Sequence, residues 1–260
     1  MLGAIAGDVI GSSYEWNSTK KTDFILFKAD SEFTDDTVLT VAIAYSILKN
    51  ESYVSSLKRF GNNYPAGYGA SFYEWLNSKN SDPYNSWGNG SAMRVSPVAY
   101  AFNSIDEVLE EAKKSAEVTH NHPEGIKGAK ATALAIYLAR TGETKQSIKK
   151  EITKRFDYNL ERTLEKIRPN YAFEVSCQKS VPESIIAFLE ANSYEEAVRN
   201  AVSLGGDSDT MACISGSIAE AFYKKIPKEI VENTKKRLPA EFLEIIDEFY
   251  SRYIYNKTNV

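Results

Sequence analysis

Cysteine and histidine are scarce in this sequence of 260 residues, which contains two of each. The cysteines, Cys177 and Cys213, allow a single disulfide at most, so they make no disulfide framework. The histidines, His120 and His122, are too few for a histidine-rich metal cage. The sequence therefore argues against a disulfide-stabilised fold and a histidine-rich zinc centre, and we expect a reducing, cytoplasmic compartment.

A strong excess of charge is also missing, because 31 basic residues stand against 35 acidic ones and the formal net charge is -4. No bulk electrostatic attraction toward nucleic acid or a membrane surface is therefore expected. No apolar run is long enough to span a bilayer. Residues 1–6 have no basic flank and are followed too soon by Asp8 to form a signal peptide, so we expect no membrane partner.

Alternating strand patterns with turn chemistry are nearly absent, whereas apolar residues recur at helical spacing along most of the chain. No low-complexity linker divides the sequence and no repeat period is present. These patterns predict an all-α fold, a single compact, orthogonal helical domain over residues 1–260. The predicted helices cover residues 2–11, 37–49, 53–60, 69–76, 92–102, 105–118, 123–139, 145–156, 160–167, 180–190, 193–204, 211–221, 228–238 and 240–253.

Several helix starts carry local signals. A serine followed three residues later by glutamate indicates a capping box, and three pairs fit: Ser104 with Glu107, Ser180 with Glu183, and Ser193 with Glu196. Four lysines in the predicted helix 145–156 are interpreted as a solvated face and not as a phosphate-binding patch: Lys145, Lys149, Lys150 and Lys154.

Two acid-rich turns precede apolar helices, FTDDT at residues 33–37 and LGGDSDT at residues 204–210. Capping is the simple interpretation of each, because Asp, Ser and Thr are favoured N-caps and acids suit the first turn. Each turn offers more groups than a cap needs, however, and carboxylates that face one another need protons or cations. Ligands that are all oxygen suit a hard cation such as magnesium. If the turns meet, a two-metal site is the hypothesis they favour.

The N-terminal helix has glycines at positions 3, 7 and 11, a stripe that allows another helix to approach closely. Asp8 lies on this helix and Glu15 follows it; alone, these would be an ordinary helix acid and a loop acid. Residues 16–32 are polar and irregular, and we interpret them as a loop that could cover a site.

A glycine-flanked loop at residues 86–94, SWGNGSAMR, can present backbone N–H groups to an anion, although this signal is weak by itself. His120 and His122 lie on another loop, where functional groups concentrate. A histidine in such a turn is more often a structural hydrogen-bonding residue.

Taken together, these segments resemble the ADP-ribosylglycohydrolase family, which includes the enzyme that reactivates dinitrogenase reductase. The resemblance extends from Gly3 to about Ala221 and depends on five segments in the same order: residues 7–15, 33–37, 87–94, 119–120 and 203–210.

The resemblance implies an all-α domain with two magnesium ions in a central cleft. The implied metal ligands are Glu15, Thr34, Asp35, Asp36, Asp207, Asp209 and Thr210. The implied ADP-ribose-binding loop consists of Ser86, Trp87, Gly88, Asn89 and Gly90, with His120 beside the distal ribose and Asp8 beneath the cleft as a further substrate-site residue.

The implied activity is magnesium-dependent hydrolysis of the bond at C1 of the distal ribose, with release of ADP-ribose. As a hypothesis, Asp35 takes a proton from the attacking water and Glu15 protonates the leaving group or acts as a gate. The substrate would be an ADP-ribosylated protein or a small ADP-ribose conjugate, a nucleic-acid adduct remains open, and we expect a monomer.

Two other functions remain open at this stage, a catalytically silent ADP-ribose-binding module and a magnesium-dependent phosphohydrolase. The leaving group is also open among arginine, serine, an acetyl ester and a base. The sequence does not place the aromatic that stacks on adenine, for which Tyr84, Trp87 and Tyr100 are candidates, or the contacts of His122.

Overall fold

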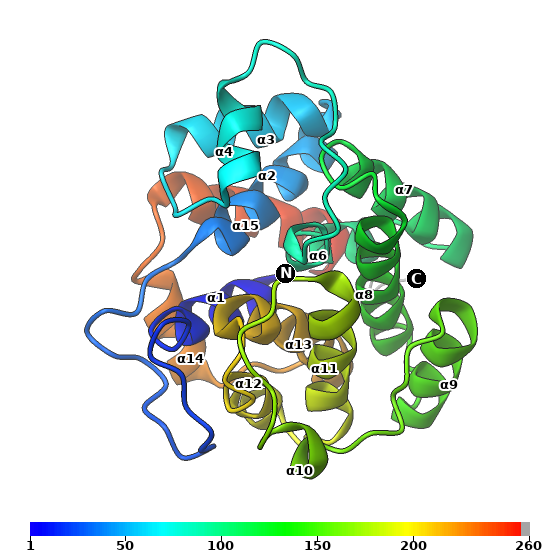
Figure 1. The fold of residues 1–260 in the computed structure, drawn as a ribbon. Helices are drawn as coiled ribbons and strands as arrows, with labels where there is room; N and C mark the ends of the chain where they lie inside the picture. The colour runs from blue at the N-terminus through cyan, green and yellow to red at the C-terminus, as the bar shows by residue number, and fades with distance from the viewer. Residues whose placement is uncertain (256–260) are drawn as a thin grey trace.

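Helix α13 (Ser208–Tyr223) lies at the centre of the fold, because its residues from Ser208 to Ala219 are all buried. It packs most extensively on α1 (Leu2–Ser12) and also on α12, α11 and α8. Figure 1 shows α1 and α13 in the middle of the molecule, with α2, α3 and α4 at one end and α10 to α12 at the other. The start of α13 carries the second acid-rich turn, and α1 carries Asp8 beside it.

The computed structural model describes residues 1–255, in which every regular element is a helix and the one β-bridge joins Gly88 to Ser176. The all-α prediction is confirmed. The helices are α1 (Leu2–Ser12), α2 (Asp35–Lys49), α3 (Tyr53–Asn63), α4 (Ala70–Asn77), α5 (Gly90–Met93), α6 (Ser96–Ala101), α7 (Ile105–Glu117), α8 (Pro123–Arg140), α9 (Lys145–Phe156), α10 (Leu164–Ile167), α11 (Cys177–Leu189), α12 (Tyr194–Val202), α13 (Ser208–Tyr223), α14 (Lys228–Lys235) and α15 (Ala240–Tyr253).

The glycine stripe of α1 explains the close packing of α1 on α13. A Cβ on Gly7 would lie 2.1 Å from the carbonyl oxygen of Ala212, and one on Gly11 would lie 2.5 Å from the Cα of Asp209. Both neighbours are backbone atoms, which cannot rotate away as a side chain can. Glycine at these positions therefore fixes the distance between α1 and the start of α13.

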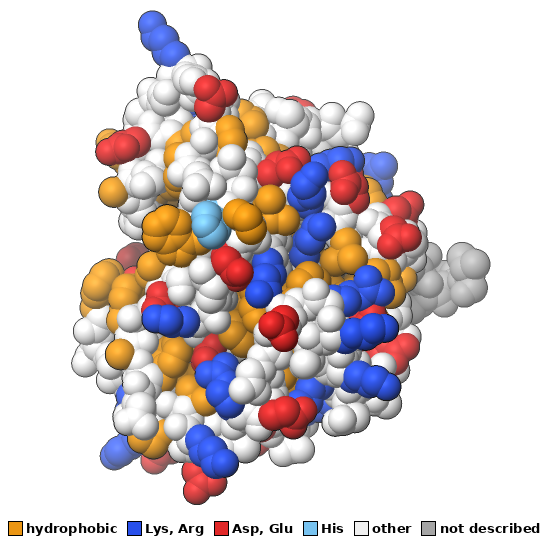
Figure 2. All heavy atoms as spheres, turned by 45° about the vertical axis from the view of Figure 1, so that its right-hand side comes forward, with side chains coloured by type: hydrophobic (Ala, Val, Ile, Leu, Met, Phe, Trp, Pro, Cys, Tyr) orange, Lys and Arg blue, Asp and Glu red, His pale blue; other side chains and the backbone are white. Residues whose placement is uncertain are grey.

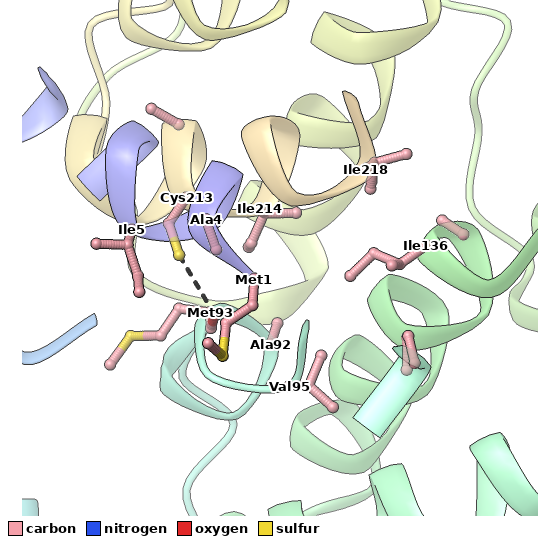
Figure 3. Close-up of a cluster of buried hydrophobic side chains, with 14 of the residues drawn as sticks. Met1, Ala4, Ile5, Ala92, Met93, Val95, Ile136, Cys213, Ile214 and Ile218 are labelled. Atoms are coloured by element: carbon pink, nitrogen blue, oxygen red, sulfur yellow. Dashed lines mark hydrogen bonds between the residues drawn. The ribbon is translucent and has the colours of Figure 1, made fainter. Parts of the chain in front are cut away.

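A buried cluster ties α5 to the two central helices. Figure 3 shows Ile5 of α1, Met93 of α5 and Ile214 of α13 among the buried side chains of this cluster. The Sγ of Cys213 donates to the carbonyl oxygen of Met93 at 3.3 Å. Because α5 lies within the glycine-flanked loop of residues 86–94, this contact positions the loop relative to α13. Both cysteines are buried and free.

The predicted helix 92–102 is wrong in one respect, because the chain forms two short helices, α5 and α6, that are separated at Arg94 and Val95. Pro97 lies in the first turn of α6. A proline in a continuous helix would lack the N–H that bonds to the carbonyl of Met93 and would clash with that carbonyl. The break leaves Arg94 inside the protein with 1% of its surface exposed.

The capping-box prediction at Ser180 is also wrong. Helix α11 begins at Cys177, where the backbone N–H donates to the carbonyl of Trp87 at 3.0 Å. Ser180 is therefore already inside the helix, and its hydroxyl donates to the carbonyl of Ser176 at 2.8 Å. Pro182 follows within the same helix.

The other two capping predictions differ in outcome. At α7 the capping box of Ser104 and Glu107 is present in full. At α12 Ser193 accepts from the N–H of Glu196 at 3.1 Å, but the Glu196 carboxylate accepts from the N–H of Asn192 at 2.7 Å. Only half of the predicted box is formed there.

The lysines of α9 do not all lie on a solvated face. Lys145 is half-buried, and its ammonium donates to the carbonyls of Leu189 and Ala191 at the end of α11. A lysine at this place satisfies carbonyls that the helix end leaves without partners. Lys150 and Lys154 are exposed as predicted.

The surface in Figure 2 carries acidic and basic side chains interspersed, without a large area of one sign on that face. Within residues 1–255, no helix combines the length and the apolar character that crossing a membrane requires.

Candidate metal centre and ligand-binding loop

The N-terminus of α2 presents the first acid-rich turn. Thr34 is the N-cap, and its hydroxyl oxygen accepts from the N–H of Asp36 at 3.3 Å. Asp36 is buried and Asp35 is half-buried. The capping interpretation is therefore correct for Thr34, and it leaves the two carboxylates free for another purpose.

Asp8 of α1 accepts hydrogen bonds from the acid-rich turn at the start of α2. It is fully buried on α1, and its carboxylate accepts from the N–H groups of Thr34 at 3.0 Å and Thr37 at 3.1 Å. It also accepts from the Thr34 hydroxyl at 2.7 Å and from the Thr37 hydroxyl. A carboxylate engaged in this way positions the start of α2 and is buried, and the expected contact of Asp8 with substrate stays a prediction.

The second acid-rich turn opens α13. Gly205 has a φ of +65°, a conformation that favours glycine, and Asp207 follows as the N-cap without a side-chain capping hydrogen bond. Asp209 lies in the first helical turn, and its carboxylate accepts from the N–H of Thr210 at 2.9 Å. Asp207, Asp209 and Thr210 are all buried.

The two turns meet. The Thr210 hydroxyl donates to Oδ2 of Asp36 at 3.2 Å, which joins positions 174 residues apart in the sequence. The other oxygen of Asp36, Oδ1, is buried and has no hydrogen-bond partner. Carboxylate oxygens of Glu15, Asp207 and Asp209 lie within 4.8 Å of one another. Distant acidic side chains therefore share one small volume.

Among the described residues, no basic side chain compensates the carboxyl groups of this volume. Within residues 1–255, no Lys or Arg forms a salt bridge with any of its carboxylates. Burial, followed by the charge of Asp209, raises the pKa of Asp35, Asp36 and Asp207 well above the usual range. The same two causes raise the pKa of Glu15 to about 7.

The donor set fits a divalent cation. The orphaned oxygen of Asp36 needs a partner, and every ligand group in the volume is a carboxylate or hydroxyl oxygen. Oxygen ligands of this kind suit a hard cation. A bound cation would supply the charge compensation that no side chain in the described structure provides.

The glycine-flanked loop borders the acidic volume. The side-chain amide of Asn89 donates to Oδ2 of Asp207 at 2.7 Å, which links the loop to the start of α13. The N–H of Gly88 donates to the Ser86 hydroxyl at 3.1 Å, and that of Asn89 donates to the carbonyl of Val175 at 2.8 Å. These two N–H groups are therefore used within the protein.

The next two N–H groups, those of Gly90 and Ser91, open α5, and the hydrogen bonds of residues 1–255 include no acceptor for either of them. N–H groups at this position can face an anion.

The two predicted histidines have different environments. His120 is buried beside the loop: a Cβ on Gly90 would lie 3.1 Å from its Nε2. His122 is the N-cap of α8, where its Nδ1 accepts from the N–H of Glu124 at 3.1 Å. His122 therefore has the structural role that a histidine in a turn most often has.

The three aromatic residues that are candidates for stacking on adenine differ in their exposure to solvent. Tyr100 is buried with 5% of its surface exposed, so it is not available to a ligand. Tyr84 is half-buried, and its ring centroid lies 6.0 Å from that of His120. Trp87 is 54% exposed on the loop itself, and its ring meets His122 edge-on at 5.7 Å between centroids.

One aromatic pair was not predicted. Trp16, next to Glu15, stacks on Phe173 with 5.4 Å between ring centroids, and both side chains are exposed. The sequence carries no signal for this pair, because neither residue belongs to a motif and each lies in an irregular segment.

Comparison with known proteins points to one family. The sequence profile of the ADP-ribosylglycohydrolase family matches residues 1–259. ADP-ribosylhydrolase ARH3 of Homo sapiens is 28% identical, over 86% of this chain and 84% of its own length. An uncharacterised protein of Archaeoglobus fulgidus is 30% identical, over 94% of this chain and 92% of its own.

Two further similarities are more distant. The ADP-ribosylarginine hydrolase Tri1 of Pseudomonas putida is 23% identical, over 89% of this chain and 72% of its own length. A chain of the solved structure titled ADP-ribosylglycohydrolase-related protein complex superposes with a TM-score of 0.75 at 23% identity, over 97% of this chain and 96% of that chain. This superposition shows the same fold.

Proposed function

Because this chain belongs to the ADP-ribosylglycohydrolase family, a family of hydrolases, we propose that it is a magnesium-dependent ADP-ribosyl hydrolase. It cleaves the bond at C1 of the distal ribose of an ADP-ribosylated protein or small ADP-ribose conjugate, and it releases ADP-ribose.

The observation that carries this proposal is the hydrogen bond between Thr210 and Asp36, together with the unpartnered Oδ1 of Asp36. It brings both acid-rich turns to one point. A binding module without turnover would have no need for buried, uncompensated carboxylates at this point, since their burial destabilises the fold.

We assign the metal ligands to Glu15, Thr34, Asp35, Asp36, Asp207, Asp209 and Thr210. Two magnesium ions at these residues would supply a grip on the ribose hydroxyls and a lowered pKa for a bound water. Thr34 lies beside these carboxylates, since its hydroxyl donates to Asp8 and its oxygen accepts from the backbone N–H of Asp36.

Proton transfer is assigned to two carboxyl groups. Cleavage at an anomeric carbon passes through an oxocarbenium-like transition state, for which an acid and a base are both useful. Glu15 is half-buried and has a pKa raised to about 7 by burial and by neighbouring charge, a value suited to giving up a proton near neutral pH. Asp35, the less buried carboxyl of the α2 turn, takes the proton of the attacking water.

The glycine-flanked loop holds the ADP part of the substrate. The N–H groups of Gly90 and Ser91 face the diphosphate, and the exposed ring of Trp87 stacks on adenine. Asn89 joins this subsite to the metal ligands through Asp207, so ligand binding at the loop aligns the distal ribose with the acidic volume.

Product identity tests the proposal. The full-length protein is incubated with ADP-ribosylated protein and magnesium, and the products are separated by chromatography. Free ADP-ribose supports the proposal; AMP or phosphate would mean a phosphohydrolase, and retention without cleavage would mean a binding module. The panel includes arginine-, serine-, acetyl- and base-linked ADP-ribose, so that the same assay assigns the leaving group.

Glu15 has its own test. We expect Glu15→Gln to lose at least about 100-fold in turnover at saturating magnesium, the usual contribution of a positioned proton donor. Glu32→Gln is the matched control, because Glu32 is an exposed acid of the following loop. Full turnover in Glu15→Gln would remove the proton-transfer role.

A further inference from the structure

Arg94 is buried in an unusual way. Only 1% of its surface is exposed, and within residues 1–255 it forms no salt bridge with a carboxylate. Its Nη2 donates to the carbonyl of Ser115 at 3.1 Å and to the hydroxyl of Thr119 at 2.8 Å, while Nε and Nη1 have no partner. A buried guanidinium without a counter-charge is costly, so its two contacts are informative.

Thr119 stands between Arg94 and His120. Its hydroxyl oxygen lies 2.8 Å from Nη2 of Arg94 and 2.8 Å from Nδ1 of His120. Because a guanidinium has donors and no acceptors, the Thr119 oxygen accepts from Arg94. Its single hydrogen is then available to Nδ1 of His120. Burial raises the pKa of the neighbouring Tyr84 phenol to about 12, so it stays protonated.

The positive charge of Arg94, which orients the Thr119 hydroxyl, favours one of the two imidazole tautomers. An unprotonated Nδ1 turns its negative lone pair toward the guanidinium, which is attractive. A protonated Nδ1 would turn its positive N–H toward the same charge, which is repulsive. Burial and the charge of Arg94 hold the pKa of His120 well below its usual range, so the ring is neutral and one nitrogen carries the proton.

We propose that Arg94, acting through the Thr119 hydroxyl, holds His120 as the tautomer with its proton on Nε2, so that this nitrogen donates to an oxygen of the ligand at the glycine-flanked loop. Nε2 is the nitrogen that faces the loop: it lies 3.1 Å from the Cβ position of Gly90 and 3.7 Å from that of Gly88. A bare nitrogen there would repel phosphate oxygens, which only accept hydrogen bonds, whereas a protonated Nε2 donates to them. Arg94 and Thr119 are therefore positioning residues.

The identity of the ligand rests on the proposed function. The tautomer of His120 can be measured whether or not the proposed function is correct. The tautomer is measured on the metal-free full-length protein by two-bond proton–nitrogen correlation spectroscopy with labelled histidine. His122→Asn assigns the two rings, since asparagine can cap α8 in place of His122. A proton on Nε2 of His120 is expected. A proton on Nδ1 in the unsubstituted protein would overturn the proposal.

Thr119→Val is the decisive variant, because it keeps the shape of the side chain and removes the hydroxyl. We expect the His120 proton to move to Nδ1 or to exchange between both nitrogens, and ADP-ribose binding by calorimetry to weaken about 10- to 100-fold. Thr119→Ser should restore both. An unchanged tautomer in Thr119→Val would refute the role of Thr119, and unchanged ADP-ribose affinity would refute donation by Nε2.

Arg94→Met tests whether the guanidinium is the source of the preference for a proton on Nε2. If this variant fails to fold, Thr119→Val and Thr119→Ser still test the proposal. Failure of the proposed function is recognised separately. A protein that shows Nε2 protonation and binds ADP-ribose through His120, but releases no ADP-ribose from any conjugate, would refute the hydrolase and leave this inference intact.

Discussion

Removal of divalent cations should make the stability of this protein fall as the pH rises. Burial, and after it the charge of Asp209, raises the pKa of Asp8 from 3.8 to about 7, and the pKa values of Asp35, Asp36 and Asp207 also lie above the usual range. As pH rises, the unfolded chain loses these protons first. The folded state is therefore favoured below about pH 4 and loses this advantage progressively up to about pH 7.

The size of the effect follows from Asp8. At about 1.4 kcal/mol per pKa unit, a rise from 3.8 to about 7 corresponds to about 4 kcal/mol of unfolding free energy. In a domain of this size, 1 kcal/mol shifts the melting temperature by about 2–4 °C, so a fall of about 10 °C is expected. Excess magnesium should reduce this fall, because a bound cation favours the charged carboxylates.

The assay is thermal melting followed by circular dichroism, in EDTA and in excess magnesium, from about pH 4 to about pH 8. Asp209→Asn should show a shallower fall in EDTA, since the Asp209 charge is the largest neighbouring charge acting on the other four carboxyls. A melting temperature in EDTA that is constant or rises from about pH 5 to about pH 7 would refute the reasoning.

Three substitutions give further tests. Gly11→Ala should cost about 1–3 kcal/mol in chemical denaturation, because its Cβ would lie 2.5 Å from the Cα of Asp209; Gly69→Ala, with no atom within 4 Å, is the control. Asp8→Asn should cost about 2–4 kcal/mol in the same assay, because an amide cannot accept from all the donors of the α2 turn. Trp87→Ala should weaken ADP-ribose binding about 5- to 150-fold by calorimetry, the usual range for loss of one stacked base.

For each of these three substitutions, one result would contradict the prediction. Equal stability of the two glycine variants would mean that α1 and α13 separate without cost. Wild-type stability in Asp8→Asn would show that the buried carboxylate is not needed to hold the start of α2. Unchanged affinity in Trp87→Ala would place the adenine elsewhere, with Tyr84 as the remaining candidate of the three.

Local sequence signals predicted most of the fold, and they failed where tertiary contacts override them. The boundaries of α9 and α15 match the prediction, because their apolar spacing and end signals agree. At α11, a serine–glutamate pair indicated a start, but the bridge between Gly88 and Ser176 begins the helix earlier. That bridge joins segments 88 residues apart, and no local pattern contains it.

In the candidate site, too, local motifs were predicted and contacts between distant segments were not. The two acid-rich turns were identified as separate motifs, and their meeting was a hypothesis that only the contact of Thr210 with Asp36 could test. The hydrogen bonds of buried Asp8 to the α2 turn could not be predicted, because they join two elements that no local pattern contains. The pairing of Trp16 with Phe173 had no signal at all, since it depends on how two loops pack.

The most direct test of the cation centre is isothermal titration of magnesium into the metal-free protein and into Asp36→Asn and Asp209→Asn, with the exposed Asp23→Asn as the control. The proposed function predicts binding of two ions to the unsubstituted protein and to Asp23→Asn, and a loss of at least one ion in each of the other variants. Absence of binding, or the same isotherm in all four proteins, would contradict a shared centre at the starts of α2 and α13.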